Sequence, residues 1–106
     1  MSDFKSTGNK GFQLTFDNGL TISVQFGTHN YCSRRSLSLE TPDNEMTMRI
    51  IESGTAEIAI WDKQSDEWFD FGHDQVKGWC TPNEVVDWMV QVKNAVSLSD
   101  IKNPEI

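Results

Sequence analysis

Two short strings, Asp17-Asn18-Gly19 and Glu52-Ser53-Gly54, each separate runs of alternating apolar residues and each end in glycine. Such a string suits a three-residue hairpin loop, in which a type I turn is followed by a glycine in the left-handed region. A two-residue loop would turn the apolar side chains of the two strands to opposite faces, whereas a three-residue loop places them on one face. The pairs expected in the first hairpin, residues 12–26, are Phe16 with Leu20, Leu14 with Ile22 and Phe12 with Val24.

The second string predicts a further hairpin, whose expected pairs are Ile50 with Ala56, Met48 with Ile58 and Met46 with Ile60. Its second strand continues into a four-residue loop at 63–66. That loop pairs Trp61 with Trp68 on the face opposite the core, while Phe69 and Phe71 lie on the core face. We therefore expect strands at 46–51, 55–62 and 67–71.

The segment after residue 80 carries strong signals for the start of a helix. Thr81 suits the N-cap, Pro82 suits the first helical position, and Glu84 completes a capping box. The expected buried stripe, at three- and four-residue spacing, is Val85, Trp88, Met89, Val92 and Val96. The expected water-facing residues are Asp87, Gln91 and Asn94, and Trp79 is expected to pack beneath the helix.

Together these elements predict an α+β fold: an antiparallel sheet of about five strands built from hairpins, with one C-terminal amphipathic helix packed on the apolar face. With 106 residues the chain is long enough for one hydrophobic core. We expect a flexible N-terminal tail at 1–10, a single domain at 11–97 and a frayed C-terminal tail at 98–106.

The charge is unevenly distributed, because residues 1–39 carry +2 and residues 40–106 carry −9. This acidic balance is not typical of a nucleic-acid-binding protein. No apolar run reaches the roughly 20 residues of a membrane span, and the start lacks the pattern of a signal peptide. We therefore expect a cytoplasmic protein without a membrane partner. Its two cysteines, Cys32 and Cys80, are too few for a disulfide scaffold, and we expect free thiols.

The third hairpin carries the first candidate binding surface. An exposed cross-strand tryptophan pair can act as a protein-binding hot spot, and nearby carboxylates could imitate nucleic-acid phosphates. The candidate contact residues are Trp61, Asp62, Asp66, Glu67, Trp68 and Asp70. The alternatives are a solubilising acidic rim and a tryptophan pair that stabilises the sheet, or that is buried under a loop or in a homodimer.

The 27–38 loop is the second candidate, as a site for an anionic nucleotide. Arg34 and Arg35 could bind phosphate, and Tyr31 could stack on a base. His29 and Asn30 complete this candidate site. The alternative is a solvated loop whose arginines pair with the acidic remainder of the chain.

Catalysis is a weaker interpretation. His73 and Cys80 invite the idea of a hydrolase, but a nucleophile, its base and an orienting group must converge in space, which proximity in sequence does not provide. The histidines and nearby acids lack metal-ligand spacing. We expect no enzyme activity, no cofactor and no metal site.

Two stretches resemble small accessory proteins of bacteriophages and prophages: residues 11–32, from Gly11-Phe12 through Tyr31-Cys32, and residues 77–82 (Lys-Gly-Trp-Cys-Thr-Pro). Such proteins often bind a host component, including defence systems. The resemblance therefore implies a phage-encoded protein that inhibits a host protein, such as a DNA- or RNA-handling enzyme, in the cytoplasm of the bacterial host cell. The sequestering of an anionic nucleotide is the alternative function.

Overall fold

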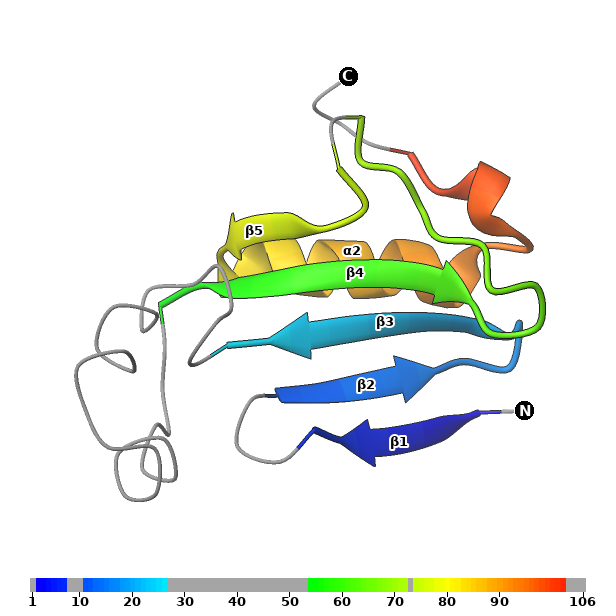
Figure 1. Cartoon of the computed structure of the whole chain (residues 1–106), viewed down its shortest axis with the longest axis horizontal. Helices are drawn as coiled ribbons and strands as arrows, with labels where there is room; N and C mark the ends of the chain where they lie inside the picture. Colours follow the sequence, from blue (N-terminus) through cyan, green and yellow to red (C-terminus); the bar gives the residue numbers. More distant parts are fainter. Residues whose placement is uncertain (1, 8–10, 27–53, 73, 103–106) are drawn as a thin grey trace.

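The computed structural model describes residues 2–7, 11–26, 54–72 and 74–102. Within these residues the chain forms a five-stranded antiparallel sheet with one α-helix against one face, which confirms the expected α+β fold (Figure 1). The strands lie side by side in chain order. The elements are β1 (Asp3–Ser6), β2 (Gly11–Thr15), β3 (Leu20–Gln25), β4 (Ala56–Asp62), β5 (Lys77–Cys80), α2 (Pro82–Asn94) and the short 3₁₀ helix η3 (Leu98–Asp100).

The first predicted hairpin is confirmed with its three-residue loop. The observed pairs are those expected, Leu14 with Ile22 and Phe12 with Val24. The backbone N–H of Phe16 donates to the carbonyl of Leu20 at 3.0 Å and closes the loop. Gly19 has a φ of 86°, a left-handed conformation that glycine adopts without steric cost.

Two strands differ from the expectation. Residues 1–10 were expected to form a tail, but Asp3–Ser6 form β1, which pairs with β2 at the edge of the sheet. The expected strand at 67–71 is reduced to one bridge, between Trp61 and Trp68, and β5 pairs with β4 instead. The expected strand at 46–51 lies outside the described residues.

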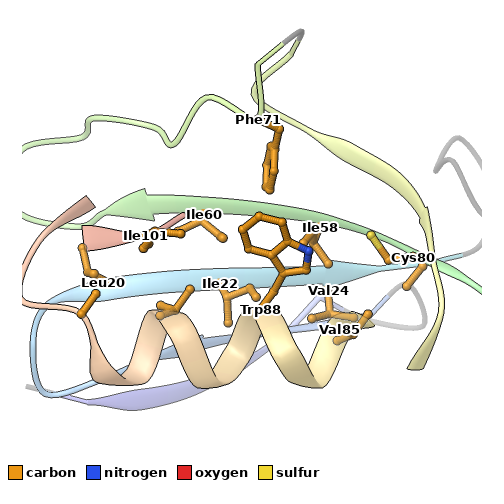
Figure 2. Packing of buried hydrophobic residues seen from close by; sticks show 13 residues of the cluster. Leu20, Ile22, Val24, Ile58, Ile60, Phe71, Cys80, Val85, Trp88 and Ile101 are labelled. Carbon is orange, nitrogen blue, oxygen red and sulfur yellow. The ribbon is translucent and has the colours of Figure 1, made fainter. Parts of the chain in front are cut away.

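The chain leaves the sheet after Trp68 because its aromatic side chains pack on the helix. The rings of Phe69 and Phe71 lie 5.9 and 5.1 Å from that of Trp88, measured between centroids. Figure 2 shows Trp88 projecting from the helix into the centre of the buried cluster, with Phe71 close to its ring. Trp79, expected beneath the helix, is instead 56% exposed.

The helix begins as predicted. The hydroxyl of Thr81 accepts the N–H of Glu84, and the carboxylate of Glu84 accepts the N–H of Thr81 at 2.9 Å. Most of the predicted stripe is confirmed, since Val85, Trp88 and Val92 are buried and Met89 packs against the core. Val96 was wrongly assigned to the stripe. The helix ends at Asn94, so Val96 is exposed and Ala95 is buried instead.

The C-terminal part after the helix is anchored as far as residue 102, and not frayed from residue 98 as expected. Ile101 is buried in the core. Gln91, expected to face water, donates to the carbonyl of Lys102 at 2.8 Å and accepts its N–H at 2.9 Å. No helix in the described part of the chain is long and apolar enough to cross a membrane.

The helix covers β3, β4 and β5 rather than the whole sheet, as one cross-strand row shows. The row runs from β1 to β4 through Phe4, Leu14, Ile22 and Ile60. Ile60 and Ile22 are fully buried, Leu14 is partly buried and Phe4 is 88% exposed. Burial therefore falls steadily toward the β1 edge, where the helix does not reach (Figure 1).

The loop of the first hairpin holds the end of the helix. The side-chain amide of Asn18 donates to the carbonyls of Val92 and Ala95, both at 2.7 Å. Carbonyls at a helix C-terminus lack partners within the helix, so these bonds satisfy groups that would otherwise need water. Oδ1 of Asn18 also accepts the N–H of Leu20 at 3.0 Å, which orients the amide toward the helix.

We expect Asn18→Asp to lower the free energy of unfolding by about 2–3 kcal/mol. The substitution keeps the acceptor for Leu20 but removes both donated bonds and brings a carboxylate to the negative end of the helix. Urea unfolding measures the change. Asp17→Asn, at an exposed residue of the same loop, is the control and should change stability by less than about 0.5 kcal/mol. Equal stability of the two variants would contradict the role of Asn18.

The capping box makes stability depend on pH. The pKa of Glu84 is lowered, chiefly because its carboxylate accepts the N–H of Thr81. Since this pKa lies below that of the unfolded chain, the charged form stabilises the fold above the unfolded pKa, and that stability is lost as pH falls through the folded pKa. Glu84→Gln should therefore be less stable than the wild type at neutral pH, with a difference that shrinks in acid. Thermal unfolding of both proteins, measured from neutral pH down through the pKa of Glu84, tests this prediction. A stability difference that does not change with pH would contradict the role of the capping box.

Candidate protein-binding surface

The turn that follows β4 is a compact loop that is stabilised by hydrogen bonds of its own aspartates. One carboxylate oxygen of Asp62 accepts the N–H groups of Gln64 and Ser65, at 2.9 and 3.4 Å. The N–H of Asp66 donates to the carbonyl of Asp62 at 2.8 Å, and Asp66 itself has a φ of 61°. Aspartate tolerates this left-handed conformation better than most residues. The loop is therefore well defined, and it returns the chain toward β4.

Trp61 and Trp68 stack on the face of the sheet opposite the helix. Their ring centroids lie 4.8 Å apart with planes inclined at 27°. Side chains alternate along β4, so Trp61 points away from the helix because its neighbour Ile60 points toward it. The expected tryptophan pair is thus present, and 43% of Trp68 is exposed to solvent.

The acids around this pair differ in what they bind within the chain. Asp70 accepts the N–H of Gly72 at 2.7 Å, so, like Asp62, it supports a turn. Asp66 and Glu67 are exposed, and among the described residues no side-chain hydrogen bond or ion pair of theirs is resolved. Of the four acids expected to contact a partner, these are the two whose carboxylates make no hydrogen bond or ion pair within the described residues.

The sheet face beside the tryptophans is less acidic than expected. Trp61 pairs with Thr21, whose hydroxyl lies 2.8 Å from that of Thr15. Beyond them, Lys63 forms an exposed ion pair with Asp3 at 3.3 Å. Among the described residues, the acids nearest the tryptophan pair are therefore those of the loop. We call Trp61, Asp62, Asp66, Glu67, Trp68 and Asp70 the Trp–acid loop.

The structure describes little of the other candidate sites. The nucleotide-site residues His29, Asn30, Tyr31, Arg34 and Arg35 lie outside the described residues, as does His73 of the hydrolase hypothesis. The thiol of Cys80 is buried in the core, where it packs with apolar side chains (Figure 2). The described part of the chain holds no group of three residues that could bind a metal ion.

An apolar groove of about 280 Å³ lies between α2 and the sheet and was not predicted. It forms where the sheet extends beyond the helix, so side chains of both elements line it. Its lining includes Phe12, Val24, Phe26, Val86 and Met89. The sequence did contain a signal for this groove: the first hairpin has more apolar residues than the apolar stripe of one helix can cover.

Comparisons of the chain with protein-family models, with curated proteins and with solved structures gave no match.

Proposed function

We propose that this chain is a non-enzymatic binding protein that contacts another protein through the Trp–acid loop. The observation that carries the proposal is the stacked tryptophan pair, of which Trp68 is 43% exposed beside the uncommitted carboxylates of Asp66 and Glu67. Large aromatic side chains that remain accessible in a folded protein are characteristic of binding hot spots.

The loop is suited to binding because it is ordered before contact. Stacking on Trp61 restricts the rotamers of Trp68, and the bonds made by Asp62 fix the loop backbone. A side chain that is already restricted loses less conformational entropy when a partner covers it. The structure therefore supports Trp68 as the anchor of a contact.

The charge indicates the chemistry of the partner. Residues 40–106 carry a net −9, and the exposed acids of the loop belong to this part of the chain. Such a field favours encounter with a basic surface and accelerates association at low salt. A basic cleft with an apolar floor, as in a DNA- or RNA-handling enzyme, matches both features.

The resemblance to phage accessory proteins extends this proposal. It implies that the chain is phage-encoded and acts in the cytoplasm of the bacterial host cell, where covering a basic cleft would inhibit the host protein. An inhibitor of this kind needs no catalytic group, because occupancy of the cleft is sufficient.

Binding should be lost when the anchor and its neighbouring charge are both changed. We expect Glu67→Lys combined with Trp68→Ala to reduce recovery of the partner at least tenfold, since the change removes aromatic contact and reverses a charge. The measurement is quantitative mass spectrometry of proteins that the immobilised chain recovers from a bacterial lysate, at low and at moderate salt.

The matched control is Asp87→Lys combined with Trp79→Ala, which changes an exposed acid and an exposed tryptophan elsewhere on the surface. This control should retain the partner. Loss of the partner in the control, or its undiminished recovery by the Glu67→Lys/Trp68→Ala variant, would contradict the proposal.

A further inference from the structure

β1 forms an edge of the sheet and ends an apolar row. Among the described residues β1 pairs with β2 alone, and Phe4 is 88% exposed on the same face as the helix. An edge strand is a template for pairing with another chain, and natural proteins usually protect such edges. The charges of Asp3 and Lys5 are of the kind that protect an edge, but Phe4 between them is an exposed apolar side chain.

The hydrogen-bond pattern shows which backbone groups of β1 face outward. The N–H of Thr7 donates to the carbonyl of Gly11 at 3.1 Å, which makes Thr7 and Gly11 a hydrogen-bonded pair. Such pairs alternate along an antiparallel ladder. With the observed register, Asp3 and Lys5 bond to β2, whereas the N–H and C=O of Phe4 point away from the sheet.

This alternation limits how a second copy of β1 could pair with the first. The two strands would be antiparallel about a twofold axis, and outward-facing residues must oppose one another. A register centred on residue 3 sets Asp3 against Asp3, and one centred on residue 5 sets Lys5 against Lys5. The register centred on Phe4 instead sets Asp3 of each copy opposite Lys5 of the other, which is a favourable cross-strand pair.

We propose that two copies of this chain pair through β1 in the register centred on Phe4. The two phenylalanines would then contact each other across the axis, and the row from Ile60 to Phe4 would continue into the second copy. Asp3 keeps its bond with Lys63, because a carboxylate has two oxygens and the side chain of Asp3 is 54% exposed. The described strands of the two copies would then form one ten-stranded sheet.

The dimer axis lies perpendicular to the sheet, so both helices share one face and both tryptophan pairs share the other. Pairing through β1 leaves each Trp–acid loop accessible. Dimerisation through β1 and binding through the Trp–acid loop are therefore independent properties, and either can be absent without the other.

The test uses charge variants of β1 measured by sedimentation equilibrium. Lys5→Asp sets two aspartates opposite each other at both positions, and Asp3→Lys does the same with lysines. We expect each single variant to dimerise roughly tenfold more weakly than the wild type. Mixed together, the two variants should form a heterodimer at wild-type strength, since every aspartate then opposes a lysine.

Lys102→Asp is the control, because it makes the same charge change at an exposed residue away from β1 and should dimerise as the wild type does. Thermal unfolding confirms that each variant is folded. A wild type that stays monomeric at the highest soluble concentration would overturn the proposal. So would a dimer that both single variants preserve, or single variants whose mixture remains monomeric.

Discussion

A single helix can cover only part of a five-stranded sheet, and this limit shapes the rest of the structure. Neighbouring strands lie about 4.8 Å apart, and a helix with its side chains is about 10 Å across. The helix therefore buries apolar side chains of β3, β4 and β5 and leaves those of β1 and β2 beside it (Figure 1). The apolar groove and the exposed Phe4 both result from this limit.

The position of the helix is fixed at both ends. Its start follows β5 directly, where Thr81 and Glu84 form the capping box, and its end is bonded by Asn18 of the first hairpin loop. The carbonyl of Gly19 accepts the N–H of Lys63 at 3.0 Å and joins this loop to the turn that begins the Trp–acid loop. The bonds that hold the C-terminal end of the helix thus lie beside the candidate binding surface.

Short sequence patterns were sufficient to predict the elements whose structure depends on a few neighbouring residues. The string at 17–19 predicted the register of the first hairpin, and the residues at 81–84 predicted the start of the helix. β1 was not predicted, because Phe4 is its only apolar residue and its four residues therefore show no repeated alternation of apolar and polar side chains. β5 was missed because it contains a glycine and a left-handed Trp79, and its register with β4 is irregular.

The tryptophan pair could be predicted from the spacing around the 63–66 loop, but the roles of Asp62 and Asp70 in supporting turns could not. The outward face of β1 could not be predicted either, since it depends on pairing with β2.

Isotope-filtered NOE spectra of a mixed labelled and unlabelled sample test whether a second copy completes the row that ends at Phe4. Contacts between the Phe4 ring of one copy and Phe4 or Leu14 of the other are the predicted result. Contacts of the Phe4 ring only within its own chain would contradict the account.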